Sequence, residues 1–228
     1  MQKSLFWLFI SCLPICLQAQ SFTRIRADFS VKSKIKEKEE ARLVMGTCYY
    51  DLSAGRMVYE VKFPSKQIWI FTDSLQYIIR NDSLIETLPG SMRPELSVFH
   101  LSLKQELSHY GLKNSAFKAT EVKVDNGMVI TRWEPPAKNK NIGKLATSVK
   151  DKQLEGVVFY HPKGHILRKQ FFRKYQSIGG LRIPTEVIDI TYDIEREIWQ
   201  QTSYSKIVVN EQSNLGLYHY KPLHGIIR

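Results

Sequence analysis

Alternation of apolar and polar residues runs through most of the chain, and this period of two restricts the fold more than any other feature. In segment 55–63, one face carries only apolar side chains: Met57, Tyr59, Val61 and Phe63. Successive side chains of a β-strand point to opposite faces, so this pattern predicts a strand with one buried face. The same pattern predicts strands at 27–35, 42–51, 67–72, 75–80, 117–124, 128–133, 156–160, 166–175, 181–192 and 198–209.

Short turn motifs separate these segments. Asn126 and Gly127 lie between 117–124 and 128–133. An Asn-Gly pair is the strongest short-range hairpin signal, because both residues tolerate positive φ. Similar turns stand at 73–74, 161–164 and 177–180. Short connections join antiparallel neighbours, so the sequence predicts a mostly β protein. Its centre would be a curved antiparallel open (half) β-barrel of about ten to twelve strands.

One segment, 92–110, has helical spacing instead. Its apolar residues are Leu96, Phe99, Leu103, Leu107 and Tyr110, with polar residues on the opposite side. This spacing predicts one amphipathic helix, which makes the fold class α+β with a single main helix. Ser91 is expected to cap its start, Pro94 to lie in its first turn and Gly111 to follow its end. The apolar face is expected to lie on the sheet.

The first residues have the composition of a secretory signal peptide. Lys3 precedes an apolar run from Leu5 to Leu17, and Leu17-Gln18-Ala19 then resembles a cleavage site. We expect residues 1–19 to be removed and 20–228 to form a single domain. The competing interpretation is a lipoprotein signal with the lipid anchor on Cys16. The residue before that cysteine is not small, which favours the cleaved form and a periplasmic location in a Gram-negative cell.

The cysteine content and the charge of the chain limit which covalent links, metal sites and binding partners are expected. Cys48 is the only cysteine outside the leader, so neither an internal disulfide nor a cysteine metal site is expected. The formal net charge is +11. A basic chain can bind nucleic acid, but an exported one meets no chromosomal DNA, so we expect no nucleic-acid partner. The basic residues then form either a solvated face that protects strand edges or a surface attracted to an anionic envelope.

No known catalytic motif is present. The sequence lacks a G-x-S-x-G elbow, a glycine-rich phosphate loop and an H-E-x-x-H motif. His161 and His165 are four residues apart, which suits a metal site on a helix, but Pro162 and Gly164 place them in a turn. We therefore predict no catalytic residue, no metal and no cofactor, and we expect that the protein is not an enzyme.

Several strand segments together resemble a known family. They carry Ala27-Asp28-Phe29, Gly46, Tyr49-Tyr50-Asp51, the residues 56–61, Phe63-Pro64, the residues 67–73 and the residues 75–78. This arrangement is similar to the periplasmic outer-membrane lipoprotein carriers (LolA-like) and related lipid-binding half-barrels. The helical segment falls where that family places a helix. Only seven residues, 20–26, separate the predicted cleavage point from the first predicted strand, so the opening helix of that family is expected to be missing or very short.

The resemblance implies a carrier. It predicts an apolar cavity between the curved sheet and the helix across its concave face, which would bind the acyl chains of a lipid or lipoprotein. Membrane partner proteins at the inner and outer membranes and a monomeric state are the accompanying expectations. The residues expected to line the cavity are Met57, Tyr59, Val61, Phe63, Trp69, Tyr77, Leu96, Phe99 and Leu103.

Two alternatives stay open at this stage. The same residues could form a filled core, because a single sequence does not distinguish a filled core from a lined cavity. The protein would then be a structural or interaction module of an envelope assembly. A hydrolase with an unrecognised site is the third hypothesis, and it requires a cleft that holds a perturbed histidine or carboxylate.

Overall fold

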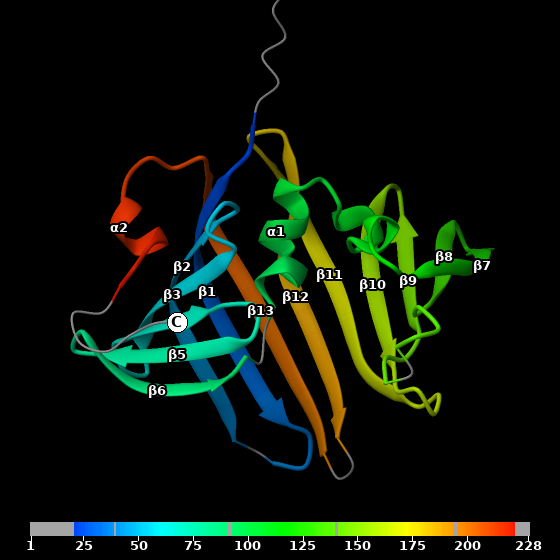
Figure 1. Cartoon of the computed structure of the whole chain (residues 1–228), viewed down its shortest axis with the longest axis horizontal. Helices are drawn as coiled ribbons and strands as arrows, with labels where there is room; N and C mark the ends of the chain where they lie inside the picture. The colour runs from blue at the N-terminus through cyan, green and yellow to red at the C-terminus, as the bar shows by residue number, and fades with distance from the viewer. Residues whose placement is uncertain (1–20, 39, 91–92, 140, 194–195, 222–228) are drawn as a thin grey trace, which may run out of the picture.

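One large curved antiparallel sheet forms the body of the protein (Figure 1). The computed structural model describes residues 21–38, 40–90, 93–139, 141–193 and 196–221. The predicted signal peptide and Cys16 therefore lie outside the described residues, as do Ser91 and Met92. The strands are β1 (Arg24–Ile35), β2 (Ala41–Asp51), β3 (Arg56–Phe63), β4 (Gln67–Phe71), β5 (Leu75–Arg80), β6 (Ser83–Pro89), β7 (Lys118–Asp125), β8 (Met128–Glu134), β9 (Leu145–Lys150), β10 (Gln153–Tyr160), β11 (Ile166–Ile178), β12 (Leu181–Asp193) and β13 (Arg196–Val209).

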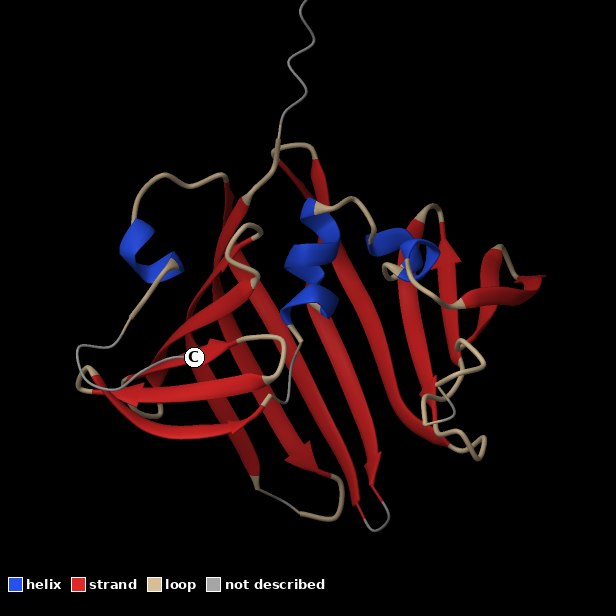
Figure 2. Cartoon of the chain, viewed as in Figure 1, coloured by secondary structure: helices blue, strands red, loops and turns tan. Residues whose placement is uncertain are grey.

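The order of the strands explains the shape of the molecule. Across the sheet it is β6-β5-β4-β3-β2-β1-β13-β12-β11-β10-β9-β8-β7, so the first and last strands pair in the middle. Two meanders run outward from that pair, and the sheet stays open at β6 and β7. The chain between these two edges has to cross the sheet. That crossing contains the helical segment, which lies over the concave face (Figure 2).

The predicted fold class is confirmed. The structure is mostly antiparallel β, an open sheet with few helices. The predicted hairpin at Asn126-Gly127 is present, with φ values of 49° and 76°. Thirteen strands are found in the described part instead of ten to twelve, because β6 and β9 were not predicted. The turns that flank these strands are Asn81-Asp82 and Asp151-Lys152, which reach positive φ without glycine and so give a weaker sequence signal.

The single long helix predicted over 92–110 is wrong. In its place are η1 (Pro94–Leu96), α1 (Val98–Leu103), η2 (Leu107–His109) and η3 (Leu112–Asn114). Ser97 is extended and caps α1, its Oγ accepting a hydrogen bond from His100 N at 3.2 Å. Gln105 has a φ of 56° and ends α1, with Glu106 N donating to Leu101 O at 2.8 Å. This is a Schellman end with glutamine in the position that glycine usually takes, so the spacing alone did not reveal it.

Two apolar clusters lie on opposite faces of the sheet. The first core cluster joins the inner faces of β1–β4 and β8–β12 to α1, η2 and η3. The second core cluster is smaller and contains Tyr49, Val58, Ile70, Tyr77, Ile79 and Tyr218. It lies under α2 (Leu215–Tyr218), which contacts β2 and β3 (Figure 1). No helix among the described residues is long and apolar enough to cross a membrane.

Candidate functional site

The nine residues predicted to line a cavity divide into three groups. Most of them belong to the first core cluster, as predicted from the alternation in β3 and the spacing in α1. The buried members are Met57, Tyr59, Val61, Phe99 and Leu103, and Trp69 packs half-buried against them. The structure thus brings six of the nine onto the inner face of the sheet.

The other three residues lie elsewhere. Phe63, at the end of β3, is 45% exposed, and Leu96 is 43% exposed because η1 and α1 are separate turns. The expectation that Tyr77 shares the inner face is wrong. Tyr77 pairs with Ile70, and both belong to the second core cluster on the outer face.

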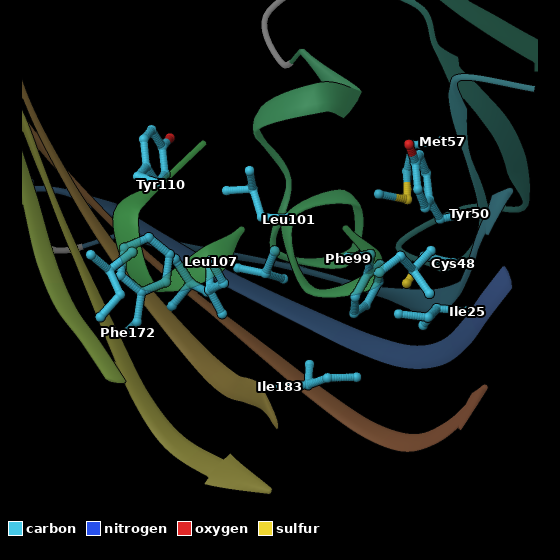
Figure 3. Close-up of a cluster of buried hydrophobic side chains, with 14 of the residues drawn as sticks. Ile25, Cys48, Tyr50, Met57, Phe99, Leu101, Leu107, Tyr110, Phe172 and Ile183 are labelled. Atoms are coloured by element: carbon cyan, nitrogen blue, oxygen red, sulfur yellow. The ribbon is translucent and has the colours of Figure 1, made fainter. Parts of the chain in front are cut away.

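Protein side chains occupy the space directly beneath α1. The ring of Phe99 lies 4.7 Å from that of Tyr204, centroid to centroid. On the neighbouring strands, the ring of Phe29 lies 4.9 Å from that of Tyr59. Figure 3 shows Phe99 and Leu107 on the side of the helical segment that faces the strands. The centre of the first core cluster is therefore packed with the protein's own rings.

A hollow opens beside this packed region, and we call it the first hollow. It measures about 430 Å³, within the range of about 300 to 1,000 Å³ that is usual for small-molecule sites. Its wall combines the end of α1 and η2 with two hairpin ends, β9–β10 and β11–β12. The lining residues are Ser102, Gln105, Leu107, Ser108, Asp151, Lys152, Gln153, Tyr175, Gly180, Leu181 and Arg182.

The first hollow combines a few buried apolar side chains with a polar rim, in which the cations of Lys152 and Arg182 outnumber the carboxylate of Asp151. Leu107 and Leu181 are buried members of the first core cluster, whereas Lys152 and Arg182 are exposed on the two hairpin ends. Ser102 is buried, and its Oγ has no hydrogen-bond partner among the described residues. A buried hydroxyl without a partner costs about 1 to 3 kcal/mol, which a polar ligand group could offset. The hollow therefore suits a molecule with both an apolar part and an anionic group.

A second hollow of about 390 Å³ lies between β13, β1, β2 and β3. Its lining includes Phe63, one of the nine predicted residues. The lining residues are Asp28, Phe29, Ser30, Met45, Gly46, Lys62, Phe63, Ser203, Tyr204 and Ser205. Asp28 and Ser30 flank Phe29, which faces the first core cluster, so strand alternation places this hollow on the outer face. It is not beneath α1.

A polar group sits on the inner face at the far side of the helical segment. Arg168 Nη2 lies 2.6 Å from Asp189 Oδ1, and Tyr110 donates to Gln170 Oε1 at 2.9 Å. Burial raises the pKa of Asp189 above its ordinary value, although Arg168 acts in the opposite direction. The inner face is thus apolar at Phe172 and Val187 and becomes polar further along β11 and β12, at Gln170 and Asp189.

His100 connects α1 to the sheet. Its Nδ1 lies 2.6 Å from the hydroxyl of Tyr50 on β2. Burial lowers the pKa of His100 and raises that of Tyr50, so both groups are neutral near pH 7. The helix is therefore held by a hydrogen bond between two uncharged groups.

Three features of the described residues bear on metal binding and nucleophilic chemistry. No group of three or more His, Cys, Asp or Glu residues that could hold a metal is found among them. The rings of His161 and His165 stack on each other at 4.3 Å. Cys48 is buried and its Sγ donates to Ala27 O at 3.3 Å, and burial raises the pKa of the thiol, which keeps it protonated. A protonated thiol is a poor nucleophile.

Comparison with known proteins identifies the fold. No family model matches the sequence, and no curated protein matches it. A LolA superfamily protein from Nitrosomonas europaea superposes with a TM-score of 0.58 at 9% identity, over 86% of this chain and 90% of its own. The fold is LolA-like. A DUF1329 family protein from Desulfovibrio piger agrees, with a TM-score of 0.60 at 11% identity, over 88% of this chain and 91% of its own.

A third structure has the same LolA-like fold. It is a candidate outer-membrane lipoprotein-sorting protein domain from Vibrio parahaemolyticus, with a TM-score of 0.58 and 13% identity over 85% of this chain and 87% of its own. Identities this low establish the fold and do not transfer the residues of a site. The residues of the first hollow have to be judged by their own geometry.

The sequence prediction missed the first hollow. None of the nine predicted residues lines it. One sequence signal was present, the Gly179-Gly180 turn, whereas the turn at Asp151-Lys152 takes positive φ without glycine. The meander β9-β10-β11-β12 places those two hairpin ends next to each other, and the fold adds η2 beside them.

Proposed function

We propose that this protein is a non-enzymatic binder and carrier of lipids or lipidated proteins outside the cytoplasm. The observation that carries the proposal is the first hollow, a partly apolar space where η2 and the end of α1 meet two hairpin ends of a LolA-like sheet. The solved structures with the same fold include a LolA superfamily protein and a lipoprotein-sorting candidate, which supports this class of ligand. The signal peptide expected at 1–19 supports export to the periplasm.

The lining of the first hollow supports an acyl chain with an acidic headgroup. Leu107, Leu181 and Tyr175 offer apolar surface inside, and the cations of Lys152 and Arg182 flank the opening. Each buried methylene contributes about 0.8 kcal/mol, which corresponds to about a fourfold gain in affinity. Affinity for fatty acids should therefore rise about fourfold per added methylene until the hollow is filled.

Titration of the purified protein with saturated fatty acids of increasing length tests the proposal. We expect displacement of a fluorescent fatty acid analogue, with affinity that grows with chain length. Native mass spectrometry of protein purified from cells, followed by lipid extraction, should find a lipid adduct. Absence of any adduct together with absence of fatty acid binding would overturn the proposal.

A pair of matched variants locates the site. Ser108→Trp places an indole in the first hollow from an exposed position of η2, and Ser203→Trp places the same group in the second hollow. We expect Ser108→Trp to lower fatty acid affinity at least tenfold and Ser203→Trp to leave it unchanged. The reverse result would move the site to the outer face. Thermal unfolding of both variants shows whether each one still folds.

A second candidate function is that of an interaction module without a lipid ligand. The packed rings beneath α1 favour it, because Phe99 and Tyr204 already fill the place where a larger cavity was predicted. In that case the protein would fold and bind a protein partner, and neither hollow would respond to fatty acids.

A further inference from the structure

The β7–β8 hairpin exposes apolar side chains that nothing in the described structure covers. β7 is exposed along its whole length, and Val122 and Val124 are 63% and 67% exposed. The hairpin lies at one end of the sheet, away from α1 (Figure 1). Long exposed edge strands with apolar side chains are sites of strand-to-strand association.

These valines belong to the inner face of the sheet. Val124 pairs with Val129 on β8, and Val129 pairs with Val149 on β9, which packs against the first core cluster. Val122 stands two residues from Val124 and shares its face. The apolar inner face therefore continues past the covered core to the edge of the sheet.

β7 also presents a free backbone edge. It is the last strand in the order of the sheet, so the N–H and C=O groups on its outer side have no strand partner within the described ranges. An added antiparallel strand would satisfy them. The charges of β7 show which strand fits, because Glu121 and Lys123 alternate with Val122 and Val124 on the opposite face.

We propose that β7 pairs with β7 of a second copy of this chain, in a two-fold antiparallel register centred on Val122. In that register Glu121 of each copy faces Lys123 of the other, which gives two attractive pairs across the interface. The valines of both copies fall on the same face, so the inner faces join. Opposite charges directly across an antiparallel pair are stabilising, and like charges are destabilising.

Neighbouring registers fit less well. A register centred on Glu121 places Glu121 opposite Glu121 of the second copy, and one centred on Lys123 does the same for Lys123. In both cases like charges face each other. Centring on Val124 pairs only the last three residues of β7, 123–125. A register centred between two residues joins the inner face of one copy to the outer face of the other, so valines would lie opposite charged groups. The pairing centred on Val122 is the one that matches both face and charge over most of the strand.

This inference stands independently of lipid binding and departs from the monomer expected from the sequence. Sedimentation velocity over a range of protein concentrations tests it. The unmodified protein should form dimers as concentration rises. Lys123→Glu should raise the dimer dissociation constant at least about tenfold, because two attractive pairs become repulsive. Lys163→Glu changes the net charge equally in an exposed turn and should have no effect.

A charge exchange defines the register. Glu121→Lys alone should also dissociate the dimer, although it additionally removes the exposed ion pair of Glu121 with Arg132 at 2.7 Å. Such exposed pairs contribute little to stability. Mixing the two single variants should form a heterodimer, and the double variant with both changes should dimerise again.

Three results would overturn the proposal: an unmodified protein that stays monomeric at every concentration, a Lys123→Glu variant that dimerises normally, or single variants that fail to associate on mixing. Thermal unfolding of each variant confirms that loss of dimer is not loss of fold. If β7 instead pairs with a strand of another protein, the purified protein will stay monomeric at every concentration, which is the first of these results.

Discussion

Replacing Phe99 by alanine tests how the helical crossing rests on the sheet. The sequence pattern treats Leu96 and Phe99 alike, since both fall on the apolar side of a helix over 92–110. The structure separates them, because Phe99 is fully buried against Tyr204 and Leu96 is 43% exposed on η1. Their alanine variants should therefore differ strongly in stability.

The size of the difference follows from burial. Truncation of a buried phenylalanine costs about 3 to 5 kcal/mol, since transfer free energy is lost and a cavity remains. Loss of the ring contact with Tyr204 falls within that range. For a domain of this size, each kcal/mol lowers Tm by about 2 to 4 °C, so Phe99→Ala should lower Tm by about 6 to 20 °C. Leu96→Ala removes a side chain that is nearly half in water, 43% exposed, and should cost about 1 kcal/mol.

The assay is urea unfolding followed by circular dichroism, with Tm measured on the same samples. Both variants carry the same kind of truncation a few residues apart, so Leu96→Ala serves as the matched control. Equal losses of stability in the two variants would show that the crossing is one continuous helix, and that the separation into η1 and α1 is incorrect.

Two further predictions concern backbone approach and pH. Gly46→Ala should lower the free energy of unfolding by about 3 kcal/mol or more, because a Cβ at this position collides with Glu60 O on β3. A Cβ at Gly216 meets no atom within 4 Å, so Gly216→Ala should change the free energy of unfolding by less than about 1 kcal/mol in the same urea assay. Stability should also fall as pH drops below about 6.5, because the lowered pKa of folded His100 lets the unfolded chain take up the proton first. His100→Asn should flatten the dependence of Tm on pH between about 7 and 5, and an unchanged slope would contradict this.

The fold was predictable because most strands carry their own signal. Alternation in β3 and the Asn126-Gly127 turn are local properties, and each is present in the structure where the sequence placed it. β6 and β9 were missed because residues such as Asn81 and Lys152 take positive φ in their turns without glycine. The helical spacing over 92–110 correctly predicted that Phe99 and Leu103 are buried. It did not reveal that the helix is interrupted at Ser97, which is extended, and at Gln105, which has positive φ.

The candidate site was less predictable, because it is formed by segments far apart in sequence. Leu107 comes from the helical segment, whereas Lys152 and Leu181 come from two hairpin ends of the meander β9 to β12, so the three meet only when that segment lies on the meander. A hollow also depends on small differences in how side chains pack, because the same residue types can either fill a space or leave it open. Nothing in the residue types beneath α1 distinguishes rings that pack together from rings that line a space.

The error at Tyr77 shows the limit of reasoning from alternation. A period of two states which residues of one strand share a face, but each turn resets the phase for the next strand. It also assumes one buried face, whereas β2, β3 and β4 have apolar residues packed on both faces, in the first core cluster on the inner side and in the second core cluster under α2 on the outer side. The outer cover depends on Tyr218, which packs edge-on against Tyr49 at 5.4 Å from the far end of the chain. Apolar residues in both phases of β3, Met57 and Val58 among them, were the sequence sign that both faces are buried, and this sign requires two covering elements rather than one.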